Sequence, residues 1–189
     1  MVAEGEPVGF IRGYKAVLNP DNSLKEILPL QNLGSTLPTA YGNFSLSASY
    51  KNLSFMLSGD YQYGAYVHSF DRQFRFSKGL KDDAIPEKAL EGLDQGANWL
   101  NFTNFFVEKS DFLKIRNIGI AYDYKLKKYL KSVNLAFIVY NPFAFTASSV
   151  DPEAALAGAR SQGAVAVGGL NYSSYSTPRQ YVGTIRVSF

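Results

Sequence analysis

Strict alternation of apolar and polar residues is the feature of this sequence that most constrains its fold. From Phe44 to Tyr50, apolar side chains alternate with serines, and after a break at Lys51 and Asn52 a second alternating run extends from Leu53 to Gln62. A period of two residues is the repeat of a β-strand whose two faces meet different surroundings. Two such runs separated by two residues predict a tight β-hairpin.

Further strands are predicted along the chain by the same pattern. The strongest cover Phe112 to Tyr124, Val133 to Asn141, and the chain end from Tyr181 to Phe189, and a weaker one covers Val8 to Lys15. Strands of about ten residues are long enough to cross a bilayer at a tilt. The sequence therefore predicts an all-β chain of antiparallel strands.

The connections between these strands alternate in length. Residues 51–52 and the lysine-rich residues 125–131 form short links, whereas residues 63–111 and 142–179 form long ones. Outer-membrane barrels have short periplasmic turns at one end and long extracellular loops at the other. Loops of this length are unusual in a compact soluble domain. The alternation therefore favours a transmembrane β-barrel.

Composition agrees with a membrane barrel and excludes other classes. Fourteen Phe, 13 Tyr and one Trp make up 15% of the chain, yet the mean hydropathy is −0.12. A lipid-facing surface averaged with a polar lumen gives such a balance. The chain has no apolar run long enough for a transmembrane helix, no visible signal peptide, and no cysteine for disulfides. A net charge of +3 is too small to indicate nucleic-acid binding.

The predicted strands are too few to close a membrane barrel. The pattern gives five or six strands, whereas the smallest membrane barrels need about eight, because an open edge in lipid leaves backbone groups without partners. We therefore expect the chain to be part of a larger protein.

Five sequence blocks, in the same order, resemble the end of SusC/RagA-type TonB-dependent transporters. The most specific is VEKSDFLKIRNIGIAYDY at Val107 to Tyr124, which resembles the family's D-F-L-(R/K)-(L/I)-R-N signature. The other blocks are GEPVGFIRGYK from Gly5, LGSTLPTAYGNFSLSASYKNLSF from Leu33, VDPEA from Val150, and GLNYSSYSTPRQYVGTIRVSF from Gly169. The chain departs from the family in lacking an acidic stretch before Leu33 and in carrying the insert AALAGARSQGAVAVGG at residues 154–169.

The resemblance implies a barrel of roughly 22 strands around a plug, with residues 1–189 as its C-terminal portion and the plug outside this segment. It further implies a bacterial outer-membrane protein that imports bulky nutrients, either oligosaccharides or peptides. The implied partners are outer-membrane lipid, a SusD-like surface lipoprotein, the TonB complex through the missing N-terminal part, and the barrel-assembly machinery.

The sequence offers no catalytic, metal or cofactor site. His68 is the only histidine, lies in a predicted loop, and is not accompanied by a G-x-S-x-G nucleophile motif, so we interpret it as a surface or loop histidine. Asp82 and Asp83 are adjacent acids, and we interpret them as part of a solvated loop or short helix. We predict that the protein is not an enzyme.

Aromatic residues gather in the long connection at residues 63–111. Four of them are candidates for contact with a substrate: Tyr63, Tyr66, Trp99 and Phe102. Membrane barrels also place aromatics at both interfaces, and loops pack around aromatic rings. The packing interpretation is favoured, and substrate contact is kept as a hypothesis.

The last strand carries a candidate assembly signal. Its alternating side chains and aromatic chain end fit the terminal strand that barrel-insertion machinery recognises: Tyr181, Ile185, Val187 and Phe189. The lysine-rich residues 125–131 are interpreted as a solvated periplasmic turn.

A small soluble β-barrel or sandwich that binds a ligand is the alternative. The two interpretations differ in where the apolar rows lie. A soluble sandwich would bury the Phe44 and Leu46 row against the Ile118 and Ile120 row, whereas a transporter would turn both rows outward to lipid.

Overall fold

The computed structural model describes residues 5, 9–126, 131–151, 153, 169–171 and 175–189. The chain divides into two compact units. Unit 1 contains Met1–Thr39, Tyr63–Asp111 and Thr146–Ser176, and unit 2 contains Ala40–Gln62, Phe112–Phe145 and Thr177–Phe189.

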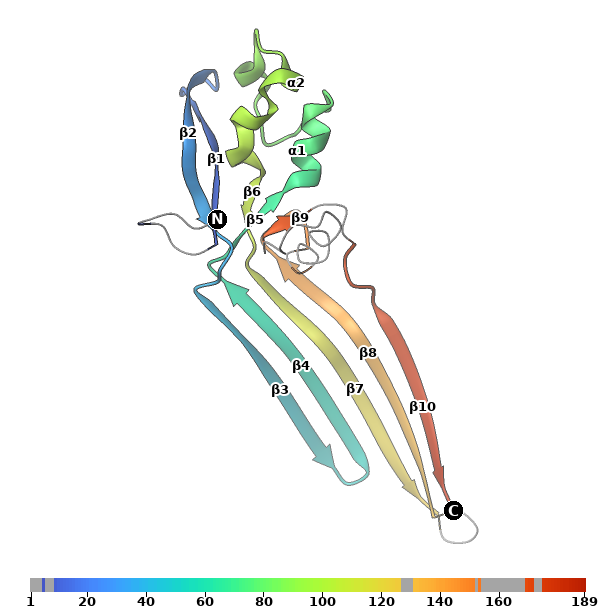
Figure 1. Cartoon of the computed structure of the whole chain (residues 1–189). Coiled ribbons are helices and arrows are strands. Elements are labelled where there is room, and N and C mark those ends of the chain that lie inside the picture. Colours follow the sequence, from blue (N-terminus) through green and yellow to red (C-terminus); the bar gives the residue numbers. More distant parts are fainter. Residues whose placement is uncertain (1–4, 6–8, 127–130, 152, 154–168, 172–174) are drawn as a thin grey trace, which may run out of the picture. The chain divides into compact units, whose positions relative to one another are not determined.

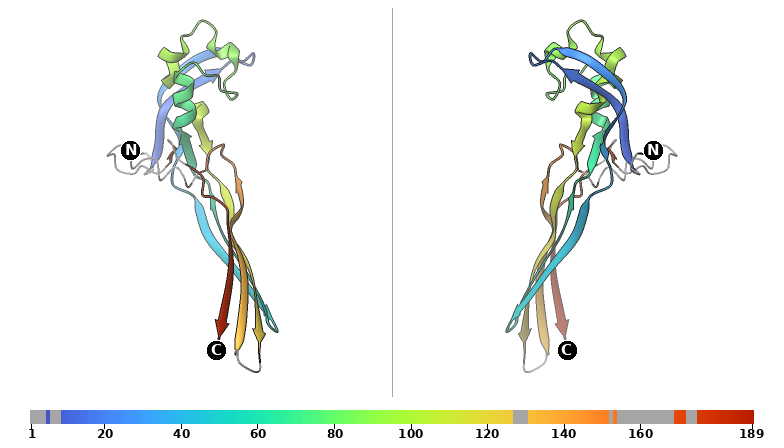
Figure 2. Two further views of the ribbon diagram at one scale, coloured as in Figure 1. Left: turned by 90° about the vertical axis from the view of Figure 1, so that its right-hand side faces the viewer. Right: turned by 90° about the vertical axis from the view of Figure 1, so that its left-hand side faces the viewer.

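Unit 2 is an antiparallel sheet of five long strands in the order β10-β8-β7-β4-β3 (Figure 1). The strands are β3 (Ala40–Tyr50), β4 (Leu53–Tyr63), β7 (Phe112–Lys125), β8 (Ser132–Thr146) and β10 (Gln180–Ser188). In the side views the sheet is a single twisted layer (Figure 2). The fold class expected from the sequence is confirmed.

The predicted hairpin between β3 and β4 is confirmed. Lys51 and Asn52 form its turn, with Lys51 at a φ of 55°, and the hydroxyl groups of Ser49 and Ser54 lie 3.3 Å apart across the two strands. The strand β8 extends past the predicted end at Asn141 to Thr146, and Asn141 within it has a φ of 51°. Asparagine tolerates this left-handed conformation better than most residues.

A β-bulge interrupts β7, which alternation alone did not predict. Ser58 pairs with Asn117 but Gly59 pairs with Ile115, so Arg116 is an extra residue. Arg116 forms two hydrogen bonds, of 2.5 and 2.7 Å, with the carboxylate of Asp60 on β4. The bulge shifts the alternation by one residue, and Ile115 thereby joins the same face as Ile118.

Unit 1 begins with a two-stranded hairpin of β1 (Phe10–Leu18) and β2 (Leu24–Ser35). The weak strand predicted from Val8 to Lys15 is confirmed from Phe10 onward, and residue 8 lies outside the described residues. The strand β2 was not predicted, because Pro29 and the two charged residues Lys25 and Glu26 obscure its alternation.

The long connection that the sequence presents as a loop contains several short elements. They are β5 (Tyr66–Ser69), α1 (Phe70–Ser77), the 3-10 helix η1 (Glu87–Leu90), α2 (Gln95–Asn98), the 3-10 helix η2 (Trp99–Phe106) and β6 (Val107–Lys109). With β9 (Leu170–Asn171), β5 and β6 form a three-stranded sheet in the order β6-β5-β9. None of the helices in the described ranges is long and apolar enough to cross a membrane.

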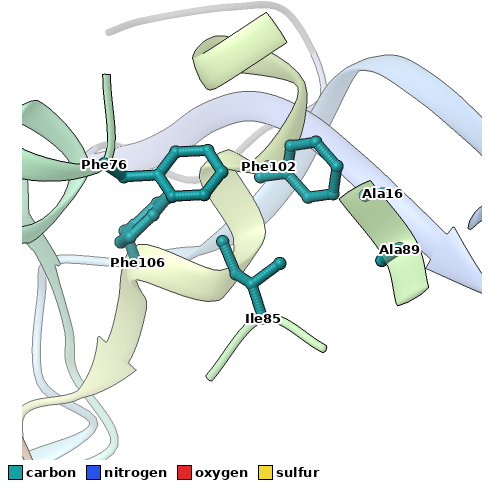
Figure 3. Close-up of a cluster of buried hydrophobic side chains, with 6 residues drawn as sticks. All are labelled: Ala16, Phe76, Ile85, Ala89, Phe102 and Phe106. Atoms are coloured by element: carbon teal, nitrogen blue, oxygen red, sulfur yellow. The ribbon is translucent and has the colours of Figure 1, made fainter. Parts of the chain in front are cut away.

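A small aromatic core holds these elements together (Figure 3). Phe76 from α1 packs against Phe102 and Phe106 from η2, with ring centroids 5.7 and 5.5 Å apart. The buried cluster comprises Ala16, Phe76, Ile85, Ala89, Phe102 and Phe106. Burial of these rings gives the connection a folded structure of its own.

Candidate functional site

One face of the unit 2 sheet is apolar on four neighbouring strands. Paired residues lie on the same face, and the pairs include Phe55 with Ile120 on β4 and β7, and Leu135 with Ile185 on β8 and β10. We call this surface the apolar face, and it contains Leu53, Phe55, Leu57, Leu113, Ile115, Ile118, Ile120, Tyr122, Val133, Leu135, Phe137, Val139, Tyr181, Gly183, Ile185 and Val187.

The opposite face of the same sheet is polar and internally hydrogen-bonded. Asn117 donates to the Ser58 hydroxyl over 2.6 Å, and Asn134 donates to Asp123 over 2.7 Å. Polar groups that bond one another across strands fix the register of the sheet. The two faces therefore suit two different environments.

The exposure of the two apolar rows, one with Phe44 and Leu46 and the other with Ile118 and Ile120, separates the two interpretations of the sequence. Leu46 is 55% exposed and Ile120 is 49% exposed, whereas a soluble sandwich would bury both. Phe44 is half-buried because its ring lies over Gly59 in the neighbouring strand. A large exposed apolar surface marks a site of contact with another apolar phase or protein. The arrangement matches a lipid-facing barrel wall.

The candidate assembly residues lie on the last strand of this sheet. Tyr181, Ile185 and Val187 share the apolar face, and the ring of Tyr181 stacks on that of Phe137 with centroids 6.4 Å apart. Phe189 follows β10 and is 80% exposed. Their recognition by assembly machinery stays a prediction.

Unit 1 carries a chain of aromatic rings at its surface. Phe70 in α1 stacks on Phe74 and meets Trp99 edge to face, with centroids 6.4 and 6.2 Å apart. Phe74 is exposed, and Trp99 is half-buried. Phe70 and Phe74 were not among the candidates, although their spacing of four residues places them on one face of a helix.

The candidate substrate-contact residues have different surroundings. Tyr63 is 60% exposed, and Tyr66 is half-buried with its ring over Gly34. Phe102 is fully buried in the aromatic core (Figure 3). Its ring has no exposed surface for a ligand, so the hypothesis of substrate contact is kept for Tyr63, Tyr66 and Trp99.

His68 is not the surface or loop histidine that the sequence suggested. It lies in β5, where its Nε2 donates to Gln73 Oε1 over 2.5 Å, and Gln73 in turn donates to the Thr103 hydroxyl over 3.0 Å. Burial of the ring lowers the pKa of His68 below its ordinary value of 6.5, while the bond to Gln73 acts in the opposite direction. The folded protein therefore favours the neutral ring.

This lowered pKa predicts a pH dependence of local stability. The unfolded state binds the proton more readily, so the stability from neutral His68 is fully present above about pH 6.5 and decreases as the pH falls toward the folded pKa. Hydrogen exchange of the β5 and α1 amides, corrected for intrinsic rates, is expected to quicken as the pH falls from neutral to mildly acidic. The variant His68→Gln should lose this dependence, and an unchanged dependence in the variant would contradict the assignment.

Arg72 anchors three segments of unit 1. Its guanidinium donates to both carboxylate oxygens of Asp82, over 2.9 and 2.5 Å, and pairs with Glu108. The hydroxyl and the backbone N–H of Ser149 both donate to Glu108. Asp82 is thus not a solvated acid, which corrects the sequence interpretation, whereas Asp83 is exposed.

The surroundings of Asp82 favour its charged form. Burial opposes ionisation, but hydrogen bonds from Arg72 and from the backbone N–H of Ala84, with the charges of Arg72 and Arg75, outweigh it and lower the pKa of Asp82. The bond to Asp82 likewise raises the pKa of Arg72. We call the ion pairs of Arg72 with Asp82 and Glu108 the ion-pair clamp, because they hold separate segments of unit 1 together. Among the residues that the structure describes, no group of three or more His, Asp or Glu is placed to hold a metal ion.

The fold of the chain is similar to that of solved chains of the RagAB peptide importer. The open-open and closed-closed states match with TM-scores of 0.62 and 0.66 at 19% and 20% identity, and a further RagAB peptide transporter structure matches with a TM-score of 0.64 at 21% identity. Each match covers 95% of this chain but only 22% or 23% of the solved chain. No family model matches the sequence, and no curated protein matches it.

These matches show that the chain has the fold of one part of a larger chain, built mainly of antiparallel strands. The predicted resemblance to a SusC/RagA-type barrel segment is confirmed at the level of the fold.

Proposed function

We propose that residues 1–189 are the C-terminal barrel portion of a TonB-dependent outer-membrane transporter of the SusC/RagA type, which imports bulky nutrients such as peptides or oligosaccharides. The observation that carries the proposal is a sheet with one apolar exposed face and one polar, hydrogen-bonded face. The fold shared with RagAB importer chains over 95% of this chain supports it.

The two open edges of the unit 2 sheet support the proposal that this chain is part of a larger barrel. The strand order of the sheet ends at β3 on one side and at β10 on the other. Strand edges in lipid leave backbone groups without partners, which costs several kcal/mol per group, about as much as burying a polar group without a hydrogen bond. Further barrel strands would pair with both edges, and the plug and the TonB-binding segment would belong to the preceding part of the protein.

A SusD-like surface lipoprotein is the proposed partner on the extracellular side. The solved structures are of RagAB assemblies, which supports a two-component importer here. The elements of unit 1, with their ring chain and their ion-pair clamp, would form the extracellular loops that face such a partner and the substrate.

The coding sequence upstream of the Met1 codon tests this proposal. An in-frame continuation that encodes further strands, a plug and a signal peptide is expected. An in-frame stop codon upstream, followed by a ribosome-binding site just before the Met1 codon, would instead support the small autonomous β-protein. Disruption of the full gene should also abolish uptake of the peptide or oligosaccharide on which growth depends.

Deletion of Phe189 is expected to lower the outer-membrane level of the full-length protein. The exposed terminal ring and the apolar row of β10 would form the signal read by the assembly machinery. Quantitative immunoblots of outer-membrane fractions measure the level, with Phe189→Tyr as a control that keeps an aromatic end. Equal levels of the deletion variant and the parent protein would refute this role.

Replacement of Tyr63 and Trp99 together by Ala is expected to weaken substrate binding about tenfold, because aromatic contacts contribute roughly 0.5–1.5 kcal/mol each. Uptake of a labelled substrate at limiting concentration measures the effect. Leu37→Ala, another exposed apolar residue of unit 1, is the control. Unchanged uptake in the double variant would leave these aromatics as interface or packing residues.

A further inference from the structure

One end of the unit 2 sheet combines lysine and tyrosine side chains. The turn between β3 and β4, the end of β7 and the chain terminus lie together there (Figure 1). Lys51 Nζ lies 5.3 Å from the ring centroid of Tyr50, Lys125 follows Tyr124 at the end of β7, and the backbone N–H of Lys131 donates to Ser188. We call this group of Tyr50, Lys51, Tyr124, Lys125 and Lys131 the lysine end.

The three lysines are available for an external anion. Within the described ranges, no ion pair uses Lys51, Lys125 or Lys131, and all three are exposed. The acid nearest to them on β7 is Asp123, two residues before Lys125, and its carboxylate accepts from Asn134 over 2.7 Å. Three lysines and the one carboxylate of Asp123 leave the lysine end net positive.

An apolar groove on the apolar face begins beside the lysine end. Leu53, which directly follows the β3–β4 turn, and its partner Tyr122 line the groove, and it continues past Leu135 and Phe137 to Gly183. Its volume is about 480 Å³, within the range of roughly 300–1,000 Å³ typical of ligand sites. No atom lies within 4 Å of the point where a side chain at Gly183 would begin, so this glycine opens the groove.

We propose that this groove and the lysine end form a binding site for an anionic phospholipid of the bilayer, a step that rests on the proposed membrane location. The lysines would bind the headgroup phosphate, the tyrosines would lie at the headgroup level, and one acyl chain would occupy the groove. Charge complementarity decides between lipid classes, because a zwitterionic headgroup gives the lysines no net negative partner.

Native mass spectrometry of the full-length protein in nanodiscs tests the charge requirement. The discs contain either phosphatidylglycerol or phosphatidylcholine, and the readout is the fraction of protein that retains a lipid. The test variant Lys51→Gln/Lys125→Gln/Lys131→Gln is compared with Lys15→Gln/Lys25→Gln/Lys109→Gln, which removes the same charge from unit 1. Each lysine near an anionic surface strengthens binding roughly fivefold. The test variant, which lacks three lysines, should therefore bind phosphatidylglycerol about a hundredfold more weakly and retain correspondingly less of it.

The variant Gly183→Leu tests the groove without a change of charge. Its side chain would fill the groove, and retention of phosphatidylglycerol should fall, whereas Gly183→Ala adds one carbon in open space and should retain the lipid. Added glycerol phosphate should not compete, because the acyl chain contributes to binding.

The outcomes separate this site from the proposed function. Equal retention of both lipids by the parent protein, or equal losses in the two triple variants, would overturn the lipid site while leaving the barrel in place. A parent protein that fails to fractionate with outer membranes would overturn both proposals.

Discussion

The substitution Phe137→Arg is expected to lower the amount of the full-length protein in the outer membrane. Phe137 lies on the apolar face, is 47% exposed, and pairs with Gly183 on β10. If this face meets lipid, the charged side chain enters hydrocarbon and destabilises the folded barrel by about 2–4 kcal/mol near the bilayer midplane. Urea unfolding of the protein refolded into lipid vesicles measures the loss.

The matched control for Phe137→Arg is Thr184→Arg. Thr184 follows Gly183, so it lies at nearly the same depth but on the polar face, opposite Ala136. Its arginine would enter the lumen and should cost much less than the lipid-facing one. Similar losses in both variants would mean that the two faces meet the same surroundings, which contradicts a membrane barrel.

Replacement of Phe102 by Ala is expected to have the second large effect, confined to unit 1. The ring is fully buried and packs 5.7 Å from the ring of Phe76 and 6.3 Å from that of Phe105, measured between centroids. Removal of a buried phenyl ring leaves a cavity and costs about 3–5 kcal/mol. Hydrogen exchange at the α1 and η2 amides should therefore quicken strongly, with little change in the strands of unit 2.

Leu100→Ala is the control for this core variant. Leu100 lies in the same helix η2 but is 47% exposed, so its truncation should change exchange by a small amount. If Phe102→Ala leaves exchange unchanged while substrate uptake falls, the ring would be a substrate contact rather than a core residue.

Long alternating strands were predictable because their signal is local. The rows around Phe55 and Ile120 alternate without interruption, so their faces follow from the sequence alone. The bulge at Arg116 was not predictable, because it depends on the bidentate pairing with Asp60, a residue 56 positions earlier in the chain. An extra residue placed by a distant partner leaves no periodic signal.

The folded structure of residues 63–111 escaped prediction for a related reason. Its helices are short, and their core depends on rings from separated positions, such as Phe76 and Phe106, that meet only after folding. For His68, the sequence gives no sign of the bond to Gln73 five residues later. The sequence likewise gives no sign that Asp82 pairs with Arg72, which lies ten residues earlier, in α1.

The central claim is that the apolar face of unit 2 meets lipid, and single cysteines along β7 test it most directly. Residues 1–189 contain no cysteine, so no native thiol in this segment competes with the introduced one, and the unsubstituted full-length protein gives the background signal. Thiols at Ile118, Ile120 and Tyr122 should resist a water-soluble maleimide in intact outer membranes and react with a lipid-soluble one. Thiols at Asn117, Gly119 and Ala121 should show the reverse order of reactivity. Loss of this alternation, with all six positions reacting alike with the water-soluble reagent, would contradict the account.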